Sequence, residues 1–321
     1  MLSFGLQNLL SPMVLFFVLG LLPVWAKSDL SIPEAVARFL ALYLLVSIGF
    51  RGGAEVGHHG LTAPLVSAIA AGVALSFAMP FIAYALLRAF TGLGATDAAA
   101  IAGHYGSISA VTFAAVTGML TQLSVSYDGY LVAVAAAMET PAIFAALLIA
   151  SHERKAGPRR GEFVREVLFN GSIFVLLGSF AIGAITGERG LTMLKPFILD
   201  PFAGVLCLFL LDMGMAAGRG LRQGRRYLSL PVTSFAVVLP LIGATIGAAM
   251  AATLGLSVGS TAVLITLAAS ASYIAAPAAM RLALPAANPA LALTLSLGVT
   301  FPFNLLVGIP LYIAVAGRIA Q

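Results

Sequence analysis

The chain has 321 residues, of which 60% are hydrophobic and 9% are charged. Soluble domains carry about 25% charged residues, so this chain has too few charges to cover a water-facing surface. A soluble enzyme, a nucleic-acid-binding protein and a disordered chain are therefore excluded, despite the net charge of +5. The single cysteine, Cys207, lies in an apolar run and cannot support a disulfide framework. The composition predicts an integral membrane protein.

Ten apolar stretches are long enough to cross a bilayer as helices of about 20 residues. They lie near residues 9–26, 33–50, 62–90, 98–120, 127–151, 165–187, 197–218, 228–253, 257–280 and 288–317. The runs do not alternate apolar with polar residues, as the strands of a membrane barrel do. Residues 1–10 lack the positive charge typical of a signal peptide. The sequence predicts an all-α membrane protein with ten transmembrane helices, the first of them retained.

Basic residues gather on one side of these spans. The loops after the odd-numbered spans, with their flanking helix ends, hold thirteen of the seventeen basic residues, and the other side holds Arg51, Arg189, Lys195 and Arg318. Because basic loops stay in the cytoplasm, both termini are predicted to lie outside. The arginines that follow the seventh span are interpreted as part of this signal or as lipid contacts: Arg219, Arg222, Arg225 and Arg226.

The same features recur in the same order in two halves of five spans. The matches are Gly49 with Gly214, Gly53 with Gly218, Pro64 with Pro231, Ser107 and Ser109 with Ser270 and Ser272, and Thr140-Pro141 with Thr300 and Pro302. Because five is odd, the second half must enter the membrane upside down. We expect a first five-helix repeat over 1–152, a short basic cytoplasmic linker over 153–164, and an inverted repeat over 165–321. Such 5+5 repeats are typical of secondary transporters.

Spans four and nine are poor continuous helices. Residues 103–109 hold two glycines and two serines, and residues 268–277 hold two serines and Pro277. Glycine costs a helix about 1 kcal/mol relative to alanine, and proline removes a backbone donor. Two interrupted helices at matching positions indicate a transport site, where helix N-termini suit an anion and serine oxygens suit an alkali cation. The alternative is that the small residues only allow close helix packing.

Ionisable groups inside a membrane are functional candidates. Glu139, in the fifth span, is the first choice for a cation ligand or a proton-coupling carboxylate; the alternative is a structural role beside Pro141. Asp212 is either a tether between helices or a site residue. His104 is either a neutral hydrogen-bonding residue or a substrate contact. Asn304 is expected to satisfy backbone groups freed by the nearby proline.

At these motifs the sequence resembles the sodium-dependent bicarbonate transporters first known from cyanobacteria and their bacterial relatives. The similarity covers nearly the whole chain, including Ile48 to Gly53, and is sharpest in three blocks: Gly106 to Thr112, Met138 to Ala142, and Ala268 to Asn288. The cyanobacterial members carry an aspartate where this chain has Tyr273, and another where it has Glu139. Their central cytoplasmic loop is also longer.

The resemblance implies a multi-pass protein of the bacterial inner membrane, usually a trimer, with no cofactor apart from Na⁺ as the coupling ion. A scaffold or gate would come from spans 1, 2, 6 and 7, and a moving core from spans 3–5 and 8–10. Bicarbonate and Na⁺ would be held where spans four and nine cross. A PII-type signalling protein is a possible partner in this family.

The sequence therefore predicts sodium-coupled uptake of bicarbonate or a similar small anion by an elevator-like mechanism. The expected substrate contacts are Gly106, Ser107, Ser109, Ser270 and Ser272, with Tyr105 and Tyr273. The expected cation or coupling residues are Glu139, Ser109, Ser272 and Thr300, with Na⁺ at Glu139. The main rival is a proton- or sodium-coupled transporter of an organic anion, in which the two tyrosines shape another pocket. A membrane-embedded enzyme or a sensor is a remote alternative, since no nucleophile–base spacing and no signalling domain are recognisable.

Overall fold

The computed structural model describes residues 10–26, 28–59, 62–152, 171–224, 228–273, 276–277, 280, 284 and 286–320. These residues form helices and no strands, which confirms the all-α prediction. Eight segments within them are long and apolar enough to cross a membrane, fewer than the ten predicted. The difference arises because α2 (Pro12–Ala26) and α13 (Val258–Ala268) are apolar but shorter than a full crossing.

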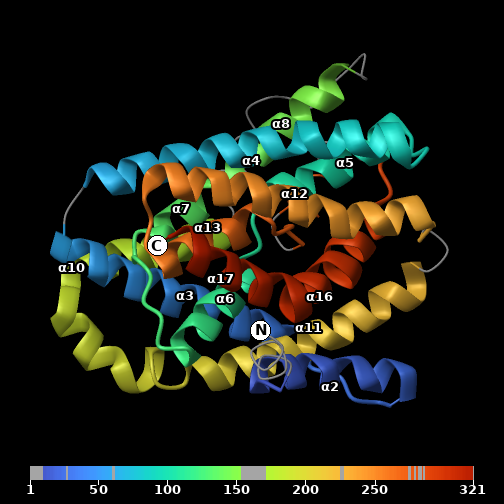
Figure 1. The fold of residues 1–321 in the computed structure, drawn as a ribbon. Coiled ribbons are helices and arrows are strands. Elements are labelled where there is room, and N and C mark those ends of the chain that lie inside the picture. Colours follow the sequence, from blue (N-terminus) through green and yellow to red (C-terminus); the bar gives the residue numbers. More distant parts are fainter. Residues whose placement is uncertain are drawn as a thin grey trace.

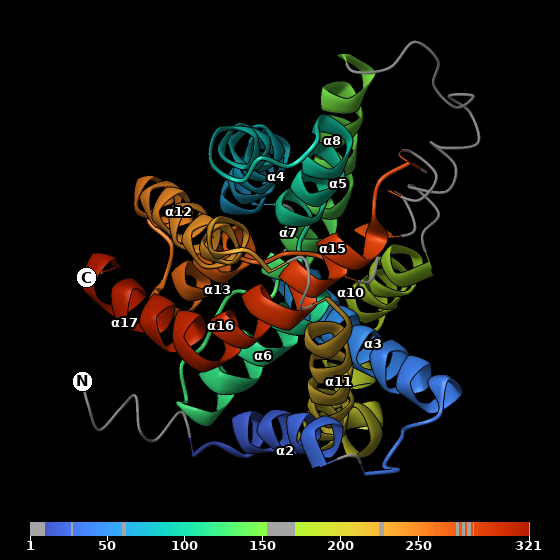
Figure 2. The same cartoon turned by 90° about the vertical axis from the view of Figure 1, so that its right-hand side faces the viewer.

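Four helices form one side of the molecule and pack in two close pairs (Figures 1 and 2). α3 (Glu34–His59) lies against α10 (Gly171–Ile198), and α2 lies against α11 (Phe202–Gly224). Glycines bring the backbones together. A Cβ on Gly53 would lie 1.8 Å from the carbonyl oxygen of Phe180, and one on Gly214 would lie 2.2 Å from that of Phe17. Small residues allow this approach in membranes, so each pair meets backbone to backbone.

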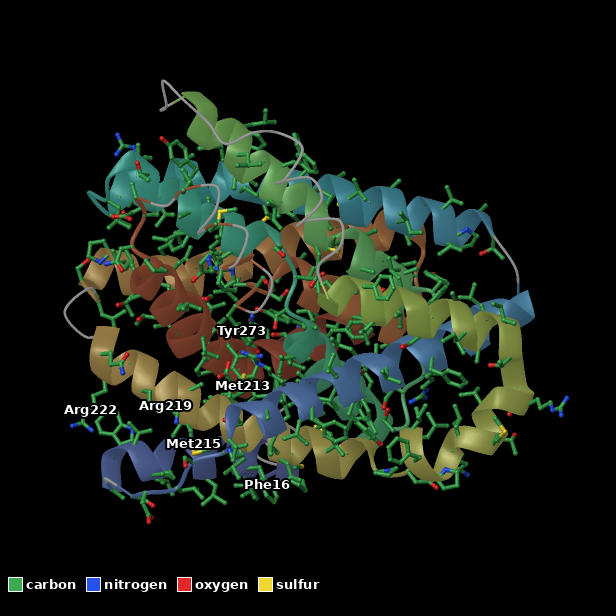
Figure 3. The ribbon with its side chains drawn as sticks, turned by 180° about the vertical axis from the view of Figure 1, so that it is seen from behind. Phe16, Met213, Met215, Arg219, Arg222 and Tyr273 are labelled. Atoms are coloured by element: carbon green, nitrogen blue, oxygen red, sulfur yellow. The ribbon has the colours of Figure 1, made fainter. Side chains whose placement is uncertain are left out.

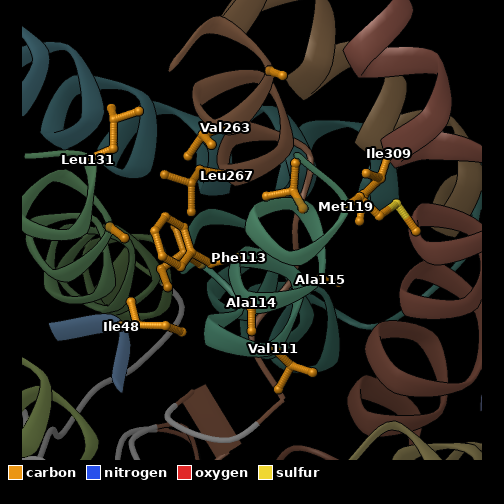
Figure 4. Packing of buried hydrophobic residues seen from close by; sticks show 14 of the residues in the cluster. Ile48, Val111, Phe113, Ala114, Ala115, Met119, Leu131, Val263, Leu267 and Ile309 are labelled. Atoms are coloured by element: carbon orange, nitrogen blue, oxygen red, sulfur yellow. The ribbon is translucent and has the colours of Figure 1, made fainter. Parts of the chain in front are cut away.

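The remaining helices form the other side and the centre. α4 (Ala63–Phe90) packs on α5 (Ala95–Gly106) and α8 (Glu139–His152), while α12 (Leu230–Leu254) packs on α13, which contacts α17 (Ile309–Ile319). α4 and α12 run beside one another (Figure 1). α6 (Ala110–Gln122) and α7 (Leu131–Ala137) lie between the two sides. Phe113, Leu131 and Leu267 are fully buried in this centre (Figure 4).

The fifth and sixth predicted spans differ from the structure. The fifth begins at Leu131 rather than near residue 127 and is interrupted at Met138, where Ser76 Oγ bonds the Met138 carbonyl and accepts from the Ala142 N–H at 3.2 Å. The sixth turns at Gly187, whose φ of 55° favours glycine, and helix continues to Ile198. The loop predicted between spans six and seven is therefore mostly helical.

The last span contains two π-helical stretches. It runs through α15 (Pro289–Leu293), η2 (Thr294–Thr300), α16 (Phe301–Phe303), η3 (Asn304–Gly308) and α17. The prediction that Asn304 satisfies backbone freed by the proline is wrong. Its Nδ2 donates to the Ala269 carbonyl at 2.8 Å, and its Oδ1 accepts from the Tyr312 hydroxyl at 2.9 Å. The amide therefore links the last span to the interruption in the ninth.

Several expectations lie outside the described residues. They concern the linker at 153–164, the start of the second repeat at 165–170, residues 1–9, Arg225 and Arg226.

Candidate functional site

The fourth span is interrupted between α5 and α6. α5 ends at Gly106, and Ser107 and Ser109 have extended backbones, with ψ of 141° and 112°. Ser109 caps α6, since its Oγ accepts from the Thr112 N–H at 3.1 Å. A Cβ on Gly106 would lie 2.4 Å from the Pro80 ring. Because Gly106 has no side chain, the end of α5 can lie directly against α4.

The ninth span is interrupted after α13, which ends at Ala268. Residues 270–272 are not helical. Ser270 Oγ donates to the Leu267 carbonyl at 2.8 Å, and Asn304 donates to the Ala269 carbonyl. Two backbone carbonyls at the end of α13 are thus bonded by side chains of the protein.

Three hydrogen bonds join the two interruptions. The Ser109 N–H donates to Ser270 Oγ at 3.1 Å, and the Ser272 N–H donates to the His104 carbonyl at 2.7 Å. His104 Nδ1 lies 2.7 Å from the Ser272 carbonyl oxygen. Because a carbonyl only accepts, this nitrogen must carry the proton. Of the two roles predicted for His104, the structure shows the hydrogen-bonding one.

A small cavity of about 40 Å³ lies beside this junction. Its polar lining comes from both interruptions and from the start of α8: Ser109, Ser272, Tyr273 and Glu139. The opposite wall is apolar and comes mainly from α3, with Phe209 of α11: Ala41, Leu44, Leu45, Ile48 and Phe209. One water needs roughly 10–15 Å³ measured in this way, so the cavity holds only a few atoms.

Three buried polar atoms at or beside the junction have no hydrogen-bond partner among the described residues. They are Ser107 Oγ, Glu139 Oε2 and the Tyr273 hydroxyl. Leaving such a group unpaired costs about 1–3 kcal/mol, and buried polar groups are rarely left so. Tyr273 lies inside the molecule (Figure 3), its ring edge-on to Phe301 with the centroids 5.4 Å apart. Glu139 and Tyr273 line the cavity, so their unpartnered atoms are available to a ligand there.

Two further hydroxyls on the cavity wall accept hydrogen bonds from backbone N–H groups. Ser109 Oγ accepts from the Thr112 N–H, and Ser272 Oγ accepts from the Ala276 N–H at 3.3 Å. Ala110 and Val111, in the first turn of α6, also line the cavity. First-turn N–H groups have no carbonyl partner within their own helix. The cavity wall is therefore rich in hydrogen-bond donors.

The remaining predicted residues lie elsewhere. The Tyr105 hydroxyl lies 2.7 Å from Thr300 Oγ1, which donates to the Ala236 carbonyl at 2.6 Å, and the Tyr105 ring packs edge-on to Phe235. Five predicted site residues do not line the cavity, although Ser270 holds the junction together: Tyr105, Gly106, Ser107, Ser270 and Thr300.

Helix α11 carries Asp212, Arg219 and Arg222, which the sequence analysis singled out. Asp212 is buried but does not line the cavity. On the same helix, Met215 is fully buried and Met213 packs on the core, and Arg219 and Arg222 lie toward the end of the helix (Figure 3).

The sequence did not predict the apolar wall of the small cavity. Phe209 and the α3 residues carry no chemistry of their own, so they gave no signal as site residues. The only hint was the Ile48 to Gly53 block, whose first residue lines the cavity.

The family model of the Na⁺-dependent bicarbonate transporter superfamily matches residues 12–317, nearly the whole chain. The chain belongs to this superfamily. The family resemblance seen in the sequence is thereby confirmed. Membership of a transporter family, together with the long apolar helices, makes the chain a multi-pass membrane protein and not an enzyme. No curated protein sequence matches the chain significantly.

Proposed function

We propose that the protein is a secondary transporter that couples Na⁺ to the uptake of bicarbonate or a similarly small anion. One observation carries the proposal: three buried polar atoms, Ser107 Oγ, Glu139 Oε2 and the Tyr273 hydroxyl, lack partners where two interrupted helices meet. Intramembrane helix interruptions of this kind are where secondary transporters bind their cargo.

The donors on the cavity wall favour an anion. The hydroxyls of Ser109, Ser272 and Tyr273 all lie on the cavity wall, where they can donate hydrogen bonds to an anion. The first turn of α6 adds unpaired N–H groups and the positive end of a helix dipole. A cavity of about 40 Å³ suits an anion of a few heavy atoms better than a bulky organic acid.

Glu139 favours a cation beside that anion. Its carboxylate lines the cavity with one free oxygen, and the oxygens of Ser109 and Ser272 lie on the same wall. Sodium prefers such oxygen ligands. Moving one negative charge into a cell against the membrane potential costs about 2.3 kcal/mol per 100 mV, and one Na⁺ carried with the anion cancels that charge.

The 5+5 inverted repeat also belongs to this proposal. It is supported by the matched glycines, which lie at the closest approach of a helix pair in each half. Gly49 and Gly53 of α3 face the α10 backbone. Gly214 and Gly218 of α11 face α2, with Gly218 against the Val24 side chain. Equivalent pairs also occur between α4 and α5 and between α12 and α13. The scaffold of α2, α3, α10 and α11 would stay fixed while the core moves past it in an elevator-like cycle.

The proposed orientation places both termini outside a bacterial inner membrane, in accord with the basic loops. A trimeric assembly and control by a PII-type regulator rest on the family resemblance alone.

Uptake into proteoliposomes tests the function. Radiolabelled bicarbonate is supplied with and without an inward Na⁺ gradient, to the native protein and to Ser107→Ala. Sodium-dependent uptake that falls in the variant is the expected result. If folded protein takes up no bicarbonate but does take up an organic acid, the proposed substrate is wrong, and Tyr273 becomes the first residue to examine for the change of cargo.

A further inference from the structure

A second and larger cavity, of about 320 Å³, lies between α3, the end of α6 and the turn that joins α10 to α11. Its polar lining includes Arg51, Thr121, Gln122, Tyr127 and Asp200. Arg51 lies in the second half of α3, and the other residues lie at the end of α6 or in loops. The distribution of basic residues places this side of the membrane outside the cell. The cavity therefore faces the side from which an imported solute arrives.

Ile48 lines both this cavity and the smaller one at the helix junction. Its side chain is 6% exposed and belongs to the same buried cluster as Val111 and Phe113 of α6 (Figure 4). Val111 also lines the small cavity. Ile48 thus stands between the two cavities, with α6 beside it.

Arg51 lies one helical turn further along α3, on the wall of the larger cavity. Its side chain is exposed and makes no ion pair with a described residue. Asp200 also lines this cavity and is likewise unpaired among the described residues. An arginine without a carboxylate partner has its five N–H donors free for a mobile anion.

We propose that the larger cavity is the outer access vestibule of the transport site, that Arg51 draws the oxyanion into it, and that Ile48 is the side chain that closes it from the site. The proposal rests on the proposed function, to which it adds the route of access and the residue that recruits the anion. A fixed charge on the wall of a concave surface raises the local concentration and the arrival rate of an oppositely charged solute.

Cysteine labelling tests the charge without measuring transport. The chain has one cysteine, so Cys207→Ser gives a cysteine-free background. Thr121→Cys then places a thiol on the vestibule wall, and Thr253→Cys places one at the exposed outer end of α12 as a control. In right-side-out vesicles, the rates of modification by membrane-impermeant anionic and cationic thiosulfonates are compared with Arg51 intact and in Arg51→Gln.

We expect the anionic-to-cationic rate ratio at residue 121 to fall several-fold in Arg51→Gln, because a fixed positive charge raises the local concentration of the anionic reagent and lowers that of the cationic one. The ratio should recover in Arg51→Lys, and the ratio at residue 253 should not change. An unchanged ratio at residue 121, or an equal change at both positions, would overturn the role of Arg51.

A second pair of variants tests the closing residue. Val111→Cys places a thiol on the wall of the small cavity. Reagent added from outside should modify it slowly with Ile48 present and at least several-fold faster in Ile48→Ala, whereas Leu45→Ala, on the same wall but not lining the vestibule, should leave the rate unchanged. Equal rates with and without Ile48 would exclude it as the barrier.

The labelling and the uptake assays separate the two proposals. Charge-dependent labelling without sodium-dependent bicarbonate uptake would retain the vestibule and reject the substrate. Uptake with charge-independent labelling would retain the function and reject the vestibule.

Discussion

His104 and Ser272 hold each other by two hydrogen bonds of 2.7 Å, one between the Ser272 N–H and the His104 carbonyl and one between His104 Nδ1 and the Ser272 carbonyl. The two residues come from spans four and nine and lie 168 positions apart in the sequence. The pair therefore fixes the position of one interruption against the other, and with it the position of the donors on the cavity wall.

Removing the imidazole should loosen this junction. In His104→Phe the Ser272 carbonyl loses its donor, which should cost about 1–3 kcal/mol of stability. His104→Asn keeps an amide N–H near the position of Nδ1 and should lose less. Thermal unfolding in detergent measures the stability of both variants. A His104→Phe variant with the same melting temperature as the native protein would contradict the structural role.

Tyr273→Phe removes a buried hydroxyl that no described residue bonds. Because an unpaired buried hydroxyl costs about 1–3 kcal/mol, the variant should be as stable as the native protein or more so. If the hydroxyl donates to the anion, the KM for bicarbonate should rise several-fold. A clear loss of stability would show that the hydroxyl has a partner within the protein instead.

Glu139→Gln keeps the shape of the side chain and removes its charge. Uptake should lose its dependence on the Na⁺ gradient, whereas Glu139→Asp, the residue of the cyanobacterial relatives, should keep part of it. Initial rates over a series of Na⁺ concentrations provide the measurement. The cation role is excluded if the Gln variant responds to Na⁺ as the native protein does.

Gly106→Ala should destabilise the protein, because the added methyl would lie 2.4 Å from the Pro80 ring. Overpacking of this kind costs roughly 1–3 kcal/mol. Gly204→Ala is the matched control, since nothing lies within 4 Å of a Cβ there. It should leave the melting temperature unchanged or raise it slightly, and equal shifts in the two variants would argue against the close contact.

Patterns in the sequence predicted the helices and the interruptions well, because apolar length and the clustering of glycine, serine and proline act locally. They did not predict the grouping of the polar side chains. The tyrosine and threonine at positions 105 and 300 were assigned to the site, yet they bond each other in a separate apolar cluster. The register of the last span depends on π-helical turns, each of which shifts the side chains that follow to another face, and no pattern of residue types reveals such a shift.

The interruption at Met138 was missed for a related reason. It is held by Ser76 from another helix, so its cause lies in the tertiary contact and not in the local sequence.

The glycines of the four-helix side have a mechanical consequence. Where backbones touch, there is no layer of side chains that can change rotamer and let one helix slip past the other. The α3–α10 and α2–α11 pairs should therefore each move as a rigid unit. Movement of the core relative to these four helices should be confined to the boundary with α6 and α7, which is lined by side chains. That boundary carries Ile48, so the same side chain would lie both on the sliding surface and at the opening of the route.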